Sequence, residues 1–342
     1  MKKGQIITGT VEKVVFPNKG MISAEEGRKV IVKNTIPGQK ISACVNKIRK
    51  GKAEARLLEV LEKSELELEE AACPHFGNCG GCTYQNLSYE NQIKIKEEQI
   101  KDLLAEVVAE TCDFGQVFEG VKHSPAQFGY RNKMEFSFGD SFKDGPLALG
   151  MHKRGSFYDI VSVEECKIVD ADYNKILSAV LHFFQKEEAT FYHRMHHVGY
   201  LRHLLVRKAV KTKEILIDLV TTTQDIRKSV EENVALAKHN VPVPGEAELL
   251  EAFREMLTTL PLDGKIVGIL HTRNDSVADI VANEGTDILY GEDFFFEELL
   301  GLKFQISPFS FFQTNSLGAE VLYETAREFI RDSYREEHGL DF

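Results

Sequence analysis

Three cysteines within ten residues constrain the fold of this chain more than any other feature. Cys73, Cys79 and Cys82 are separated by five and by two residues, with glycines at positions 77, 80 and 81. Glycine allows a loop to fold tightly enough for the three thiols to approach one centre. Six cysteines in 342 residues do not make a disulfide scaffold, so this cluster indicates a metal before a disulfide.

A closed metal site needs a fourth ligand, and the sequence offers two candidates. Cys166 is the first, because a distant fourth cysteine is common in iron–sulfur sites. His75 is the rival, and it would favour zinc. The spacing favours an iron–sulfur cluster over zinc, and a loop of thiols without metal is the remaining alternative.

Residues 4–61 have the pattern of a small barrel. Segments rich in Ile and Val alternate with turn signals such as Pro37-Gly38. The expected strands are Ile6–Val15, Met21–Ser23, Lys29–Val32, Gln39–Lys47 and Ala53–Leu61. Five short strands in so few residues predict a closed barrel of the OB type.

The charge of the chain is divided unevenly. Residues 1–63 carry 14 Lys and Arg against 6 Glu, a balance of +8, whereas the remainder carries −19. Such asymmetry indicates a surface that binds a polyanion, with an ordinary solvated basic face as the alternative. The candidate RNA contacts in the barrel are Lys47, Arg49, Lys50 and Lys52, with Arg56 beside them. Phe16 is the only aromatic residue there, so phosphate contacts must outweigh base stacking.

The rest of the chain predicts a mixed α/β body with a largely antiparallel sheet. The expected strands are Lys133–Phe138, Ala148–His152, Tyr158–Val163, Leu201–Val210, Glu214–Val220 and Ile266–Thr272. Helices are expected over Ser88–Val108, Leu177–Phe184, Ile226–Ala237, Glu248–Thr258 and Leu317–Asp332, the last capped by Asn315 or Ser316. In the first of these helices, an apolar stripe is expected from Ile93 to Val107.

Three further groups could carry chemistry. Arg131, Lys133 and Arg154 are candidate RNA contacts, with ordinary surface charge as the alternative. The histidines between 193 and 203 have no spacing that suits a closed metal site. Residues 309–315 are either a buried aromatic loop or a wall for a flat base or cofactor, where Phe311 would contact a base and Gln313 offers both a donor and an acceptor.

The order of these features resembles the RNA (uracil-5-)-methyltransferases of 23S rRNA and tRNA, in the subgroup with a TRAM domain and a [4Fe–4S] cluster. Residues 32–39 and 49–55 resemble the TRAM barrel, and Cys73, Cys79, Cys82 and Cys166 match the cluster ligands. The segments 130–133, 199–203 and 311–315 match further signatures, so the resemblance covers nearly the whole chain.

The resemblance implies a multidomain protein and a covalent mechanism. The expected parts are a TRAM barrel (1–62), a cysteine loop with a long helix (63–114), a central α/β domain (115–303) and the start of a Rossmann-like methyltransferase domain (304–342). It implies that Gln313 contacts S-adenosylmethionine and that Phe311 lies near the target base. A cysteine thiolate then attacks uracil C6 and C5 takes the methyl group, once the base has left its stack.

The chain departs from that family in its catalytic parts. It contains no G-x-G tripeptide, and neither Cys44 nor Cys112 is placed to be the nucleophile, so no catalytic residue is assigned. We expect an N-terminal part of the enzyme that by itself transfers no methyl group. A non-enzymatic RNA-binding metalloprotein is the alternative, whereas a radical enzyme would need a C-x3-C-x2-C triad, which is absent.

The expected partner is structured RNA, 23S rRNA before tRNA, with no DNA and no membrane. The N-terminus has no apolar segment of signal-peptide length, and no apolar run is long enough to span a bilayer. A cytoplasmic location is therefore expected.

Overall fold

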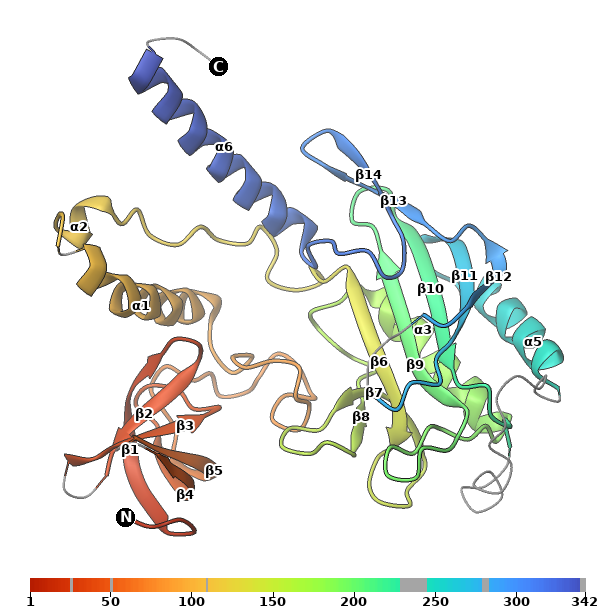
Figure 1. Ribbon diagram of the computed structural model, residues 1–342, viewed down its shortest axis with the longest axis horizontal. Coiled ribbons are helices and arrows are strands. Elements are labelled where there is room, and N and C mark those ends of the chain that lie inside the picture. Colours follow the sequence, from red (N-terminus) through yellow and green to blue (C-terminus); the bar gives the residue numbers. More distant parts are fainter. Residues whose placement is uncertain (25–26, 50–51, 109, 228–244, 279–282, 339–342) are drawn as a thin grey trace. The chain divides into compact units, whose positions relative to one another are not determined.

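The computed structural model describes residues 1–342 except 25–26, 50–51, 109, 228–244, 279–282 and 339–342. It contains two compact units (Figure 1). The first comprises Met1–Ala72 with Cys82–His123, and the second comprises Cys73–Gly81 with Ser124–Phe342. The expected division into four parts stays a prediction.

The first unit contains the expected closed barrel of five strands. Its strands are β1 (Ile6–Val15), β2 (Lys19–Ser23), β3 (Lys29–Lys33), β4 (Lys40–Arg49) and β5 (Lys52–Glu62). They pair in the order β1-β2-β3-β5-β4, and the antiparallel pairing of β1 with β4 closes the ring. Alternate residues such as Val30 and Val32 of β3 are buried inside, as the two-residue period of a strand requires.

Two helices complete this unit, α1 (Tyr89–Val108) and α2 (Phe114–Val117). Ile95 of α1 belongs to the barrel core, and Asn18 accepts hydrogen bonds from Tyr84 (2.9 Å) and Gln99 (3.2 Å). Leu103 and Val107, however, are exposed. The expected apolar stripe of this helix is therefore buried at Ile93 and exposed toward the end of the helix.

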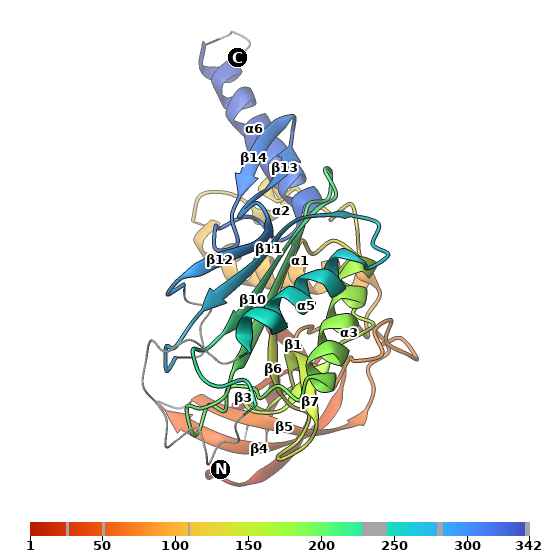
Figure 2. The ribbon, with the colours of Figure 1, turned by 90° about the vertical axis from the view of Figure 1, so that its right-hand side faces the viewer.

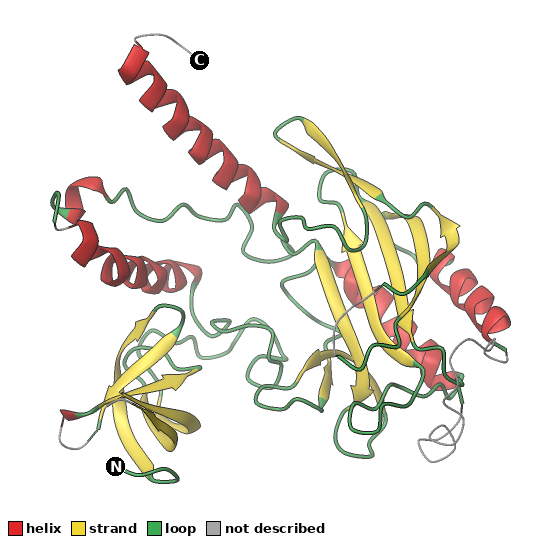
Figure 3. Ribbon diagram, in the orientation of Figure 1, coloured by secondary structure: helices red, strands yellow, loops and turns green. Residues whose placement is uncertain are grey.

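The second unit is built on a sheet of seven strands (Figure 3). The strands are β6 (Lys133–Asp140), β7 (Leu147–His152), β8 (Ile160–Ser162), β9 (Leu201–Lys208), β10 (Glu214–Thr221), β11 (Lys265–Arg273) and β12 (Thr286–Gly291). Their order is β12-β11-β10-β9-β6-β7-β8. Among the described strands of this sheet, β10 and β11 are the one parallel pair, which confirms its expected, largely antiparallel character.

Helices α3 (Ala171–Lys186) and α5 (Glu246–Thr258) pack together on one side of the sheet (Figure 2). Phe184 of α3 meets Phe253 of α5 with ring centroids 5.5 Å apart, and both side chains are fully buried. Of the helix expected over Ile226–Ala237, residues 228–237 lie outside the described residues, and Ile226 itself stands in a bend.

The second unit ends in a hairpin and a long helix. The hairpin, β13 (Phe295–Leu299) and β14 (Leu302–Ile306), was not expected. Helix α6 (Ser316–His338) begins close to the expected position, where the Asn315 side chain accepts a hydrogen bond from the Gly318 N–H (2.9 Å). None of the described helices is both long and apolar enough to cross a membrane.

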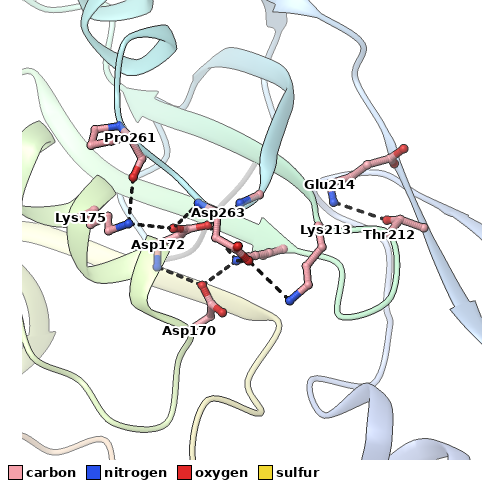
Figure 4. Close-up of polar contacts among 10 residues, drawn as sticks. Asp170, Asp172, Lys175, Thr212, Lys213, Glu214, Pro261 and Asp263 are labelled. Carbon is pink, nitrogen blue, oxygen red and sulfur yellow. Dashed lines mark hydrogen bonds and ion pairs between the residues drawn. The ribbon is translucent and has the colours of Figure 1, made fainter.

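A buried ion pair joins the sheet to the start of α3 (Figure 4). Lys208 of β9 donates hydrogen bonds to Asp170 (2.6 Å) and Asp172 (2.8 Å), while Asp172 also accepts from the N–H groups of Asp263 (3.0 Å) and Gly264 (2.8 Å). Burial raises the pKa of Asp172, but the hydrogen bonds from Lys208 and from the two backbone N–H groups outweigh it and lower the pKa to about 2.

Replacing Asp172 by Asn should lower the free energy of unfolding by about 3 kcal/mol at neutral pH, because it leaves the Lys208 charge buried with one partner fewer. The folded pKa lies below the unfolded value of 3.8, so this stabilisation is complete above that value and is lost as the pH falls toward 2. Denaturant unfolding between pH 7 and pH 2 measures both effects.

The matched control is Asp263→Asn. The Asp263 side chain is 71% exposed and lies 3.8 Å from Lys208, so its loss should cost under about 1 kcal/mol. Equal losses in the two variants would contradict the assignment of Asp172 as the main counter-charge.

Candidate functional site

Residues 307–315, which contain Gln313, are fixed to the central sheet by Arg207. This residue lies in β9 with its side chain buried. Its guanidinium donates to the carbonyl of Pro308 (3.0 Å) and to the carbonyl of Ser310 (2.5 Å). Burial lowers the pKa of Arg207 to about 10, so the group stays charged at neutral pH. A buried cation is costly unless its N–H groups are satisfied, and the carbonyls of this loop satisfy two of them.

Asn132 fixes the other end of the same loop. Its backbone N–H donates to the Thr314 carbonyl (2.9 Å), and its side chain donates to the Gln313 carbonyl (2.9 Å) and to the Ser316 hydroxyl (2.8 Å). Arg131, one residue earlier, forms a β-bridge with Asn315. Two segments about 180 residues apart in the sequence are therefore held side by side.

Glu297 in β13 anchors the beginning of α6. Its buried carboxylate accepts hydrogen bonds from the N–H groups of Val210 (2.7 Å) and Lys211 (3.0 Å), and from the Ser316 hydroxyl (2.7 Å). The unexpected hairpin thus ties the end of β9 to the first residue of α6. A carboxylate satisfied in this way makes strong hydrogen bonds, so the position of the loop is well determined.

Phe311 and Phe312, neighbours in this loop, differ in how far their side chains are buried. Phe312 packs against a small core that includes Leu216, Leu270 and Ile306. Phe311, by contrast, is 87% exposed. Phe312 therefore matches the alternative of a buried aromatic residue, whereas a wall for a base or cofactor at Phe311 stays a prediction. Gln313 follows directly and is partly exposed, with its backbone carbonyl held by Asn132.

Residues 73–81 pack against two segments of the second unit. The Gly80 N–H donates to the His152 carbonyl (2.9 Å), and a Cβ on Gly80 would come within 2.9 Å of that oxygen. The Nε2 atom of His75 accepts a hydrogen bond from the Glu165 N–H (3.3 Å), beside Cys166. This contact brings the loop next to the distant cysteine and occupies one ring nitrogen of His75.

The donor chemistry suits a soft metal centre, but the side chains do not converge on one. Among the residues that the structure describes, no three His, Cys, Asp or Glu side chains are grouped so that they could hold a metal ion. The six cysteines, all of them within the described ranges, form no disulfide. Burial raises the pKa of the Cys79 thiol, and the neighbouring Cys73 raises it further, whereas the Gly81 N–H at 3.3 Å acts in the opposite direction.

The other predicted contact residues are distributed over both units. Lys47 and Arg49 are exposed on β4. Lys50 and the side chain of Lys52 lie outside the described residues. In the second unit, Lys133 is paired with Glu135 (2.6 Å), which reduces its value as a phosphate contact, and the Arg154 guanidinium lies 5.2 Å from the centre of the Phe76 ring.

Sequence reasoning missed Arg207, Asn132 and Glu297 as the residues that place this loop. Asn132 was visible only as part of the segment 130–133. Arg207 lies within a strand that is buried at every position, and a charged residue in such a run is a signal that could have been used.

Comparison with known proteins places the chain in a family. No family model matches it. It is 45% identical over 332 residues to a protein of Caldanaerobacter subterraneus subsp. tengcongensis described as an uncharacterized RNA methyltransferase, with 97% of this chain and 68% of the relative covered. A protein of Clostridium tetani with the same description is 44% identical over 333 residues, with 97% and 67% covered. The chain belongs to this family of RNA methyltransferases.

A solved structure shows the same fold. The tRNA (uracil-54, C5)-methyltransferase of Pyrococcus abyssi, in complex with S-adenosyl-L-homocysteine, superimposes with a TM-score of 0.63 at 23% identity. The superposition covers 94% of this chain and 65% of the neighbour. At this identity the likeness establishes the fold, and the RNA methyltransferase relatives establish the family.

Replacing Glu297 by Gln should loosen the start of α6. The amide can accept through one oxygen only, and its NH2 group would face backbone donors, so we expect a loss of about 3 kcal/mol and faster amide exchange over residues 313–320. Hydrogen exchange followed by mass spectrometry measures the effect on the loop. The neighbouring Glu298 is exposed, and Glu298→Gln should change the unfolding free energy by no more than about 0.5 kcal/mol. Unchanged exchange in Glu297→Gln would show that the carboxylate does not anchor the helix.

Proposed function

We propose that this protein acts in the S-adenosylmethionine-dependent methylation of uracil C5 in RNA, with 23S rRNA as the favoured substrate and tRNA as the other. The observation that carries the proposal is the loop of Phe311 and Gln313, one side chain exposed and the backbone anchored by buried polar groups of the sheet. Membership of the RNA methyltransferase family supports the reaction class.

In this proposal Gln313 contacts the methyl donor. Its side chain offers both a donor and an acceptor, which suits the amino acid or ribose groups of S-adenosylmethionine. Because Asn132 holds the Gln313 carbonyl, the backbone at this position loses little entropy when the side chain binds. The Pyrococcus abyssi neighbour was solved with S-adenosyl-L-homocysteine, the product that this donor leaves behind, which supports the choice of cofactor.

Phe311 would contact the target base. A base that is to be methylated must leave its stack, and an exposed ring can replace part of the stacking that the base loses. Phe311 and Gln313 are two residues apart on one anchored loop. The sequence therefore sets the distance between the proposed base contact and the proposed cofactor contact.

The chemistry proposed is conjugate addition followed by methyl transfer. A cysteine thiolate adds to C6, C5 takes the methyl group from the sulfonium and releases the thioether, a base removes the C5 proton, and the thiolate leaves. No residue of this chain is assigned as the nucleophile or the base. Its residues bind the RNA and hold one side of the cofactor.

The barrel is proposed to hold the RNA through its phosphates. Lys47 and Arg49 are exposed on the strand β4, in the segment whose charge balance is +8. Lys50, Lys52, Arg131, Lys133 and Arg154 stay predicted contacts. Binding through phosphates releases counterions, so affinity should fall steeply with salt.

We propose in addition that Cys73, Cys79, Cys82 and Cys166 are the ligands of a [4Fe–4S] cluster. The spacing of the first three thiols and the contact of His75 with the turn before Cys166 support the proposal. When bound, a cluster would cross-link these segments, and no step of the methylation is assigned to it.

Purification without oxygen should therefore give about four iron and four sulfide per chain, and Cys166→Ala should lower the iron content. Cys112→Ala is the control, because Cys112 is exposed and lies outside the proposed ligand set. One tightly bound zinc without iron, or unchanged iron in Cys166→Ala, would contradict the cluster.

The reaction is tested by changing Gln313 to Ala in the gene of the organism itself. Nucleoside mass spectrometry of its 23S rRNA and tRNA should then show the loss of 5-methyluridine at one or more positions. Gln305→Ala is the matched control, because Gln305 is exposed on β14 and takes no part in the proposed site. Loss of a different methylated nucleoside would exclude uracil C5, and no change in any methylated nucleoside would exclude a role for Gln313.

A further inference from the structure

The turn between β7 and β8 presents two exposed aromatic side chains. Phe157 is 81% exposed and Tyr158 is 56% exposed. Neither ring contributes much to the core of the second unit, since burial of apolar surface is what stabilises a fold. Exposed apolar surface of this kind can mark a site that contacts a partner.

This turn is held in one conformation by its backbone. The Ser156 hydroxyl accepts hydrogen bonds from the N–H groups of Tyr158 and Asp159, both at 3.2 Å. Lys153 closes the turn at both ends, because its carbonyl accepts from the Ser156 N–H (3.0 Å) and its N–H donates to the Asp159 carbonyl (2.9 Å). Gly155 has a φ of 79°, which a residue with a side chain would adopt only with strain. The rings therefore stand on a rigid support.

Arg194 and the segment of residues 73–81 contact the turn from outside. Arg194 donates to the Phe157 carbonyl (2.9 Å), and its second terminal nitrogen lies 2.9 Å from Nε2 of His152. The Arg154 N–H donates to the Asn78 carbonyl (2.7 Å), so residues 73–81 pack against the same turn.

The charges around the two rings suit an anion. Lys153 and Arg154 precede the rings in the same turn, and Arg194 donates to the Phe157 carbonyl, whereas Asp159 is the one acidic residue of the segment 153–159 and lies 3.6 Å from Lys153. The chain as a whole carries −11, so this excess of cations is local. Exposed rings beside cations provide what a single-stranded nucleic acid needs, a flat surface for a base and charge for its phosphates.

We propose that Phe157 and Tyr158 form a stacking platform for an unpaired base of the RNA substrate, with Lys153 and Arg154 beside the phosphates. The proposal rests on the RNA substrate of the proposed function. In this proposal the turn stacks on a base, whereas the barrel contacts phosphates. The bound RNA must contain an unpaired stretch, because the bases of an A-form duplex are not available for stacking.

The absence of tryptophan from the chain allows a direct test. Phe157→Trp places one indole on the platform, and a stacked base should quench its emission. The probe is a stem–loop RNA whose loop holds unpaired uridines, with a fully paired duplex of the same stem for comparison. We expect quenching by the stem–loop and little by the duplex. Phe157→Leu, which keeps an apolar side chain but removes the ring face, should weaken stem–loop binding about tenfold, as for one lost stacking contact.

Phe142→Trp and Phe142→Leu are the matched controls. Phe142 is 60% exposed in the turn between β6 and β7, where Asp140 and Asp144 are its charged neighbours together with Lys143. Neither control should respond to RNA. If the unchanged protein binds neither RNA, the RNA substrate of the proposed function and the platform both fail. If it binds the stem–loop while the indole of Phe157→Trp is not quenched, or Phe157→Leu binds equally well, only the platform is overturned.

Discussion

Three buried polar side chains of the second unit hold the loop that carries Gln313 and the first residue of α6. They are Asn132, Arg207 and Glu297. Each group would be costly to bury alone, and each is satisfied by the loop backbone or by Ser316. Loop and sheet therefore stabilise each other. The exposure of Phe311 depends on this arrangement, because the same anchors direct Phe312 into the core.

The same principle governs the other features of the second unit. Lys208 is buried against Asp172 and joins β9 to α3, so one strand carries two anchoring cations at adjacent positions, Arg207 and Lys208. Their side chains point to opposite faces, as neighbouring residues of a strand must. Arg207 supports the candidate site, while Lys208 supports the helical layer. The turn that carries Phe157 is likewise held by a hydrogen bond from Arg194, 37 residues later in the sequence.

Local pattern located the barrel strands, six strands of the seven-stranded sheet and the long helices, but it missed β12 and the hairpin. The barrel strands were predictable because Ile and Val alternate between clear turns, and α6 because Asn315 caps it. The hairpin of β13 and β14 was missed although Leu302, Phe304 and Ile306 of β14 alternate with polar residues, and the structure buries only the last of these three. In the second half of α1, Leu103 has the helical spacing of the expected apolar stripe, but the spacing alone does not reveal that its side chain is exposed.

The sequence by itself determined the family resemblance, the candidate thiols and the choice of Gln313 as a candidate contact, because these depend on residue type and spacing along the chain. Only the tertiary structure decided that Asn132 lies beside Gln313, that His75 meets the turn before Cys166, and that Phe157 stands on a braced turn. Such contacts join residues distant in sequence. They result from the pairing of strands and the satisfaction of buried polar groups, which no local pattern records.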